Sequence, residues 1–305
     1  MKAKPNFSIP MILLGTIFLI SCSQENQTES SELTWQSVQD PSSRIHTITG
    51  FSGPEAVRYD PDQDLYFVSN FSGGGNDRDA NGFISKVTTD GEIDDLEFIT
   101  GTETHPLHAP RGMYITGDTL WAADVDGVHG FHTVSGEQVR FIDFTPFEPG
   151  FLNDIAADVD GNLYVTDTGA SRLYQVAGSN ITIVADSLPH APNGITVAPS
   201  GNLLVLAPWG GEMEFYAWNP ADASLDLFDL AAGGGNFDGI EFYEGRMLAA
   251  SQIDSSLHAI QDGTDSILIT MPGRPADIGL DTNRNQVAVP YIARNAVDIW
   301  QLPVE

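Results

Sequence analysis

The fourth copy of a short repeat reads PNGITVAPSGNLLVLAP over residues 192–208. An apolar run at 194–198 is followed by the turn residues Pro199, Ser200 and Gly201, and then by a second apolar run at 202–207. Short β-branched and apolar runs bounded by Gly, Pro, Asn and Ser predict β-strands joined by tight turns. Two further runs, at 214–218 and 225–230, complete a unit of four predicted strands.

Tetrapeptides related to Pro192-Asn193-Gly194-Ile195 begin six such units, which recur at intervals of about 40 residues or somewhat more. The second positions of the six tetrapeptides are Glu55, Arg111, Asn153, Asn193, Asp238 and Ala276. Four short strands per repeat of this length are typical of a β-propeller blade. The sequence therefore predicts an all-β fold, a six-bladed β-propeller. Equivalent positions of a radial repeat share one radius and height, so these six residues are expected to form a ring around the central axis.

The last unit is one strand short. It offers strands at 276–280, 286–291 and 296–302, and the sequence then ends. The segment Arg44–Thr49 alternates like a strand but belongs to no unit of its own. We therefore expect this N-terminal strand to close the last blade, because an open sheet edge would invite aggregation.

The composition excludes some classes of partner. The chain has 305 residues and a formal net charge of −29. Such a surface repels nucleic acid and anionic lipid, so no nucleic-acid partner is expected. The same charge attracts divalent cations, but it is equally consistent with adaptation to salt, and the sequence leaves both interpretations open.

The first residues are predicted to be a targeting segment. Lys2 and Lys4 precede an apolar stretch at 11–20 that is too short to span a bilayer. It ends in Leu-Ile-Ser-Cys at Cys22, which resembles the lipobox of bacterial lipoproteins. This resemblance implies a signal peptide at 1–21 and lipidation of Cys22. The polar, Ser/Gln/Glu-rich segment that follows predicts a flexible tether at 22–40, and the repeats place the propeller at 41–305. The alternative is an ordinary signal peptide in which the cysteine falls there by chance.

The resulting expectation is a monomeric lipoprotein of the bacterial cell envelope, facing the periplasm or the outer surface. It would contact the membrane through its lipid anchor only.

Oxygen-bearing side chains occupy four of the six ring positions: Glu55, Asn153, Asn193 and Asp238. Carboxylate and amide oxygens converging on one axis are typical of a site for a hard divalent cation. The alternative for each residue alone is a turn former, because Asn-Gly and Asp-Gly favour turns.

Three other residues are predicted to lie on the same face and to bind substrate. Arg111 is a candidate clamp for an anionic group, or alternatively an ion-pair partner of Glu55 or Asp238. Trp209 is expected to wall a pocket. His190 lies in the loop that enters the fourth blade, where it could contact substrate or simply pack the loop.

Several of these motifs together resemble the senescence marker protein 30/gluconolactonase family and, more distantly, the paraoxonases. They are Leu152-Asn153-Asp154, Asp160-Gly161-Asn162-Leu163-Tyr164, Pro192-Asn193-Gly194-Ile195 and Phe237-Asp238-Gly239-Ile240. The resemblance implies a six-bladed propeller that binds Ca²⁺, or another divalent cation, through Glu55, Asn153, Asn193 and Asp238. It also implies that Asp238 acts as a catalytic general base.

The substrate apparatus of these families is not intact. Phe151 stands where gluconolactonases carry an arginine, and Arg111 stands where paraoxonases carry a histidine. The favoured hypothesis is a calcium-dependent hydrolase of small lactones or esters, with an anionic substrate in view of Arg111. The alternative is a non-catalytic propeller that binds a ligand or protein and keeps a structural calcium. A third hypothesis, a strictosidine-synthase-like activity, is disfavoured because those propellers lack this metal set.

Overall fold

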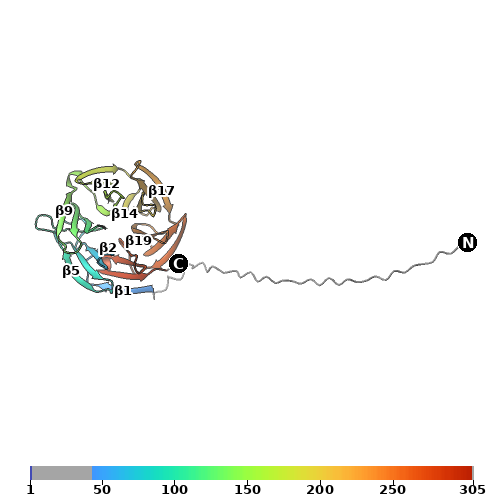
Figure 1. The fold of residues 1–305 in the computed structure, drawn as a ribbon, viewed down its shortest axis with the longest axis horizontal. Coiled ribbons are helices and arrows are strands. Elements are labelled where there is room, and N and C mark those ends of the chain that lie inside the picture. The colour runs from blue at the N-terminus through green and yellow to red at the C-terminus, as the bar shows by residue number, and fades with distance from the viewer. Residues whose placement is uncertain (2–42, 304–305) are drawn as a thin grey trace. The chain divides into compact units, whose positions relative to one another are not determined.

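Six four-stranded antiparallel sheets surround a common centre in the computed structural model, which describes residues 43–303 together with Met1 (Figure 1). The first three blades are β2 (Pro54–Asp60), β3 (Leu65–Asn70), β4 (Phe83–Thr88) and β5 (Ile93–Ile99); β6 (Met113–Thr116), β7 (Thr119–Ala123), β8 (Gly127–His132) and β9 (Gln138–Asp143); and β10 (Leu152–Ala157), β11 (Leu163–Asp167), β12 (Arg172–Ala177) and β13 (Asn180–Ala185). The next two are β14 (Ala191–Val197), β15 (Leu204–Trp209), β16 (Glu214–Asn219) and β17 (Ser224–Leu230); and β18 (Phe237–Tyr243), β19 (Arg246–Ser251), β20 (Ser256–Gln261) and β21 (Thr264–Thr270). The predicted six-bladed β-propeller is confirmed.

The last blade joins the two ends of the described chain. Its strands β22 (Gly279–Asp281), β23 (Gln286–Tyr291) and β24 (Ala296–Gln301) are completed by β1 (Arg44–Thr49), which pairs antiparallel with β24. Thr47 Oγ1 donates to Asp298 Oδ1 at 2.7 Å across this pair, and Arg44 lies 3.4 Å from the other carboxylate oxygen. The predicted closing strand is therefore confirmed, with the predicted bounds.

One strand end differs from the prediction. The second strand of the fourth blade was predicted at 202–207, but β15 spans Leu204–Trp209 and so continues through Pro208. Proline is tolerated near a strand end when its missing N–H removes no ladder bond from a neighbouring strand. β16 has no register partner beyond Leu206 of β15, so the N–H of Pro208 would have had no acceptor there.

The inner strands of neighbouring blades approach closely, which explains the glycine that follows several ring residues. A Cβ on Gly194 would lie 2.3 Å from the carbonyl oxygen of Asp238, and one on Gly239 would lie 2.3 Å from the amide nitrogen of Ile278. Both distances are far below a normal contact, so only glycine fits. The Gly in Asn-Gly and Asp-Gly is therefore required by blade packing, and in both cases it lies within a strand rather than a turn.

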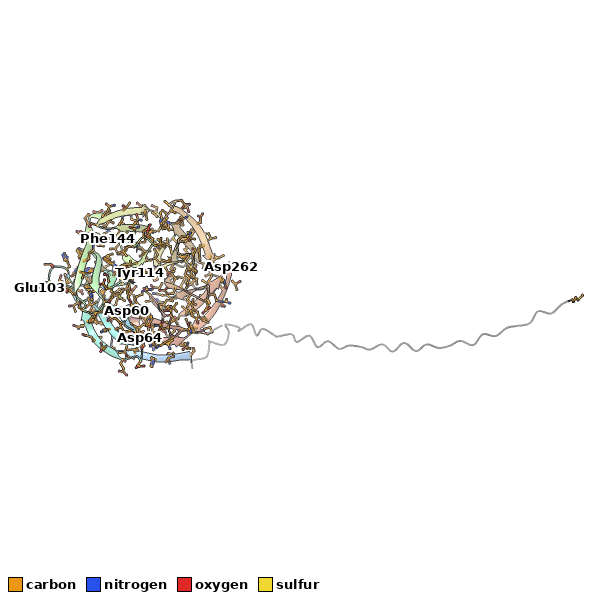
Figure 2. The ribbon with its side chains drawn as sticks, in the orientation of Figure 1. Asp60, Asp64, Glu103, Tyr114, Phe144 and Asp262 are labelled. Atoms are coloured by element: carbon orange, nitrogen blue, oxygen red, sulfur yellow. The ribbon has the colours of Figure 1, made fainter. Side chains whose placement is uncertain are left out.

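The apolar core is divided among the blade interfaces. Six clusters of buried side chains each combine residues from two adjacent blades. In one of them Phe144, which follows β9, packs edge-on against Tyr174 of β12 with ring centroids 5.2 Å apart. Figure 2 shows Tyr114, from the inner strand β6, nearer the centre than Glu103 and Asp262 at the rim. This ring of interfaces fixes the inner strands in space.

Except for Met1, the predicted signal peptide lies outside the described residues, and so do Cys22 and the whole predicted tether at 22–40. Within residues 43–303, no helix is long and apolar enough to cross a membrane.

Candidate functional site

A cavity of about 520 Å³ opens at the centre of the face that carries the loops leading into the inner strands. The four predicted oxygen donors Glu55, Asn153, Asn193 and Asp238 all line it. Trp209 and Gln252 also line it, from the ends of β15 and the β19–β20 turn. The structure thus brings together four residues that are far apart in the sequence.

A β-bulge positions each of these donors. The ladder between first and second strands shifts register between Pro54 and Val57, between Leu152 and Ile155, between Pro192 and Ile195, and between Phe237 and Ile240. Each interval contains one ring donor. A bulge adds a residue to one strand and re-aims its side chain, which is why bulges are frequent next to functional sites. The repeated tetrapeptide is therefore a repeated bulge at the mouth of the channel.

Three donor oxygens have no hydrogen-bond partner although they are buried: Glu55 Oε2, Asn193 Oδ1 and Asp238 Oδ1. The side chains that carry them are only 3% exposed. Buried polar atoms in folded proteins are nearly always paired, and an unpaired one is expensive. Three such oxygens facing one cavity indicate that a ligand completes them.

The other polar atoms of the site are held by neighbours. Gln252 Nε2 donates to Asp238 Oδ2 at 2.7 Å, which leaves Oδ1 as the free oxygen. Asn153 Nδ2 donates to Thr168 Oγ1 at 2.9 Å, and Thr168 in turn donates to the carbonyl of Pro192 at 2.6 Å. These bonds fix which atom of each amide or carboxylate remains available.

The two carboxylates are electrostatically unfavourable in the absence of a cation. Burial, and then the nearby charge of Asp238, raise the pKa of Glu55 well above its usual range. Burial raises the pKa of Asp238 to about 7. A divalent cation would neutralise this pair of acids, and two carboxylates plus two amide oxygens supply four of the six to eight ligands that Ca²⁺ takes. The donor set therefore fits a divalent metal ion.

Arg111 does not line the cavity, contrary to the expectation that it would face substrate. It is fully buried. Its Nη1 donates to the carbonyl of Leu152 at 2.9 Å, and its Nη2 donates to the carbonyl of Gly75 and, at 3.0 Å, to Asn76 Oδ1. These bonds tie the inner strand of the third blade to the loop at residues 71–82. A clamp role for Arg111 would require that loop to move away.

Phe151 also has a defined place. The guanidinium carbon of Arg111 lies 3.7 Å from the centroid of the Phe151 ring, which is a close cation–π contact. Phe151 lines the cavity together with Phe71, Trp209 and Ile292. Trp209 thus lies in the cavity wall, as predicted. Together with Phe71, Phe151 and Ile292 it forms an apolar part of that wall.

His190 lies outside the channel cavity. It faces a separate shallow depression next to Tyr216, and its Nε2 is 3.3 Å from Glu214 Oε2. Its ring centroid is 5.6 Å from that of Tyr216. The side chain points toward the outer strands because it directly precedes β14, whereas the ring residue lies three positions further on. The expectation that His190 contacts a substrate in the channel is therefore not supported by its position.

Sequence reasoning did not select Thr168, Asn76 or Ile292 as parts of the site, yet all three line the cavity. Thr168 directly follows Asp167 at the end of β11, on the face where the site was expected, and that position was the available signal. Asn76 and Ile292 come from a glycine-rich loop and a short 3₁₀ turn (Ile292–Arg294), whose paths follow from no periodic pattern.

Charged side chains occupy the channel beneath the ring. Arg58 of β2 is ion-paired with Glu241 of β18 and lies 3.5 Å from Asp277. Asp154 accepts the backbone N–H groups of Ile155 and Ile195, at 2.7 and 2.8 Å, and so joins two blades. This layer forms a fixed floor below the four ring donors.

Comparison with known proteins supports the fold. No protein-family model matches the chain, and no curated protein matches its sequence significantly. A gluconolactonase of Xanthomonas campestris matches the structure with a TM-score of 0.65 and 16% identity, over 86% of this chain and 92% of that one.

Two lyases give similar matches. A streptogramin B lyase has a TM-score of 0.60 and 14% identity, over 85% of this chain and 97% of the other. Virginiamycin B lyase from Staphylococcus aureus has a TM-score of 0.57 and 14% identity, over 85% and 89%. At these identities the likeness establishes a shared propeller fold, as the resemblance to gluconolactonases predicted.

Proposed function

We propose that this propeller is a calcium-dependent hydrolase of small lactones or esters, with its site in the channel cavity. The observation that carries the proposal is the set of unpaired, buried oxygens on Glu55, Asn193 and Asp238. A gluconolactonase among the structural neighbours supports the lactone as a substrate class. A bound Ca²⁺ would supply a Lewis acid that polarises the substrate carbonyl and acidifies a coordinated water.

Residues of the chain would bind the cation, accept a proton and exclude water. Glu55, Asn153, Asn193 and Asp238 would hold the cation. Asp238 would also accept the proton of the attacking water at Oδ1, while Gln252 keeps Oδ2 occupied and the carboxylate oriented. The apolar wall of Phe71, Phe151 and Trp209 would exclude bulk water from the carbonyl.

The substrate would be a small molecule that enters from the face with the long loops, because Arg58 and Glu241 fill the channel below the ring. We retain an anionic substrate as the favoured class. Arg111 would contact it only if the loop at 71–82 moved, since its donors are now directed to Leu152, Gly75 and Asn76.

The test is a panel of lactones and aryl esters, assayed with the purified protein in Ca²⁺ and after removal of metal. Turnover that is lost with the metal and restored by Ca²⁺ supports the proposal. Asp238→Asn should lower kcat by about a hundredfold or more, within the usual range for a general base. The matched control Asp160→Asn, on an exposed turn of the opposite face, should leave kcat unchanged.

A calcium-loaded protein that is inert across the panel would support the alternative, a binding propeller with a structural calcium. We also propose that the protein is anchored in the bacterial cell envelope through Cys22 and acts as a monomer. Cys22→Ala should then release it from the membrane fraction, and wild-type protein that is already soluble and retains residues 1–21 would refute the anchor.

A further inference from the structure

A second cluster of metal-ligating side chains lies in the second blade, apart from the channel donors. Asp124 and Asp126 occupy the turn between β7 and β8, and His129 is on β8. One carboxylate oxygen of each Asp and one ring nitrogen of His129 all lie within 4.8 Å of one another. Asp124 and His129 are fully buried, and Asp126 is partly accessible, so an ion has a path to the cluster.

Two atoms of this cluster lack a partner and face each other. His129 Nε2 is 3.7 Å from Asp124 Oδ2 and 3.6 Å from Asp126 Oδ1, which is too long for a hydrogen bond. Neither His129 Nε2 nor Asp126 Oδ1 has any other hydrogen-bond partner. A fully buried imidazole nitrogen therefore points, unpaired, between two carboxylates.

The fifth blade provides an internal comparison. His129 pairs with Ala122, which pairs with Met113 on the inner strand. His258 pairs with Ala249, which pairs with Ile240, so the two histidines occupy equivalent positions in their blades. Both ring nitrogens of His258 contact carboxylates directly: Nδ1 lies 2.8 Å from Asp265 Oδ1 and Nε2 lies 3.0 Å from Asp254 Oδ2. The equivalent contacts of His129 Nε2 are longer by more than half an ångström, although it has two carboxylates available.

The separations fit ligands of one tetrahedral ion. Two metal–ligand bonds of about 2.1 Å that meet at a tetrahedral angle place the donor atoms about 3.4 Å apart. The observed 3.6 and 3.7 Å are close to this value. Three protein ligands with a water in the fourth position is a common zinc arrangement.

The proton positions can accommodate a metal at His129 Nε2. Its Nδ1 lies 2.9 Å from the side-chain amide of Gln138, whose Oε1 has no partner. Turning that amide over would place Oε1 against Nδ1, which would then donate its proton and leave a lone pair on Nε2.

His108 is not a fourth ligand. Its Nδ1 accepts the backbone N–H of Ala80 at 3.1 Å, so in the neutral ring Nε2 carries the proton, and this atom lies 3.7 Å from Asp126 Oδ2.

We propose that Asp124, Asp126 and His129 form a second metal site, selective for Zn²⁺ or a similar transition-metal ion. A nitrogen ligand and a small, nearly tetrahedral donor set disfavour Ca²⁺, which takes six to eight oxygens. The ion would brace the β7–β8 turn against β8. Through Asp124, which accepts the backbone N–H of His108 at 2.7 Å, and the His108–Ala80 bond, it would also support the loop at 71–82 that covers Arg111.

Calorimetric titration of the untagged full chain with Zn²⁺, in saturating Ca²⁺, tests the site. Wild-type protein should bind one equivalent. His129→Phe should weaken Zn²⁺ binding at least tenfold while keeping the ring contacts with Phe131 and Phe141. Asp126→Asn should also weaken Zn²⁺ binding at least tenfold. This variant tests the site if His129→Phe does not fold. The control His132→Gln, on the exposed end of β8, and the channel variant Asp238→Asn should bind Zn²⁺ as the wild type does.

Co²⁺ provides a second readout, because a four-coordinate ion with a nitrogen ligand absorbs visible light far more strongly than an octahedral all-oxygen one. The strong absorption should appear with wild-type protein and be absent from Asp126→Asn. Failure of the wild type to bind Zn²⁺, or equal affinity in wild type and Asp126→Asn, would overturn the proposal. Either result leaves the calcium hypothesis untouched, since the channel donors are not involved.

Discussion

Replacing Asp238 with asparagine should stabilise the metal-free protein, and calcium should narrow the difference by stabilising the wild type more. Asp238 is buried, and burial raises its pKa from 3.8 to about 7. The folded protein therefore retains a proton that the unfolded chain has already lost between about pH 4 and pH 7. Stability is fully present below this window and is lost as the pH rises through it, because the unfolded state binds fewer protons there.

The size of the effect follows from that shift. Each unit of pKa corresponds to about 1.4 kcal/mol, so ionising Asp238 in the folded state costs on the order of 4 kcal/mol at pH 8. The asparagine side chain would carry no charge, and Gln252 could still donate to its oxygen. Metal-free Asp238→Asn should then unfold roughly 8 °C above metal-free wild type at pH 8, at about 2 °C per kcal/mol for a domain of this size. At pH 4 the two should coincide.

Calcium should narrow this gap at pH 8, to on the order of 1 kcal/mol where the variant gains nothing from the ion. A ligand at a hundredfold excess over its Kd adds about 2.7 kcal/mol, and the wild type gains this in full because both carboxylates bind the ion. Calorimetry of dialysed protein at pH 4 and pH 8, with and without Ca²⁺, measures all four states. The exposed variant Asp160→Asn is the control and should follow the wild type throughout. Metal-free Asp238→Asn that is no more stable than wild type at pH 8 would refute the reasoning.

Two further predictions concern parts of the fold that support the site. Arg111→Met should remove the hydrogen bonds to Gly75, Asn76 and Leu152. Amide hydrogen exchange in the loop at 71–82 should then become at least tenfold faster, whereas Arg78→Met on the same loop should leave it unchanged. Unchanged exchange in Arg111→Met would show that the guanidinium does not hold the loop. Asp298→Ala should cost about 1–3 kcal/mol in urea unfolding, because it removes the hydrogen bond from Thr47 to a carboxylate at the closing strand. Asp226→Ala on the outer strand β17 should be nearly neutral, and equal costs would argue against a special role for the closure.

The repeat predicted the positions of the ring residues because it determines their height and radius. Glu55, Asn153, Asn193 and Asp238 come from different blades, yet one structural feature, a bulge at the start of their own inner strand, places all four. Position within a repeat is thus a strong predictor wherever the backbone itself repeats.

Loops do not repeat, and the sequence predicted them less well. The placement of Arg111 depends on the path of the glycine-rich loop at 71–82, which covers it and supplies two of its acceptors. The sequence did not single out His129, because a histidine on a strand is usually a packing residue. Only the structure shows that the neighbouring turn places two carboxylates opposite its unpaired nitrogen. Contacts of this kind between a strand and a turn depend on tertiary structure and leave no local pattern in the sequence.

The closing strand also sets the order in which the molecule can assemble. β1 is the first strand of the propeller to be synthesised, but its partner β24 is the last, and the Thr47–Asp298 bond spans 251 positions. Five blades can form from neighbouring segments during translation, whereas the sixth must wait for the C-terminus. Until then β1 has no strand partner, and the first blade lacks the last blade against which it packs. We therefore expect ring closure to be the slowest folding step, and the chain to be most prone to aggregation before it.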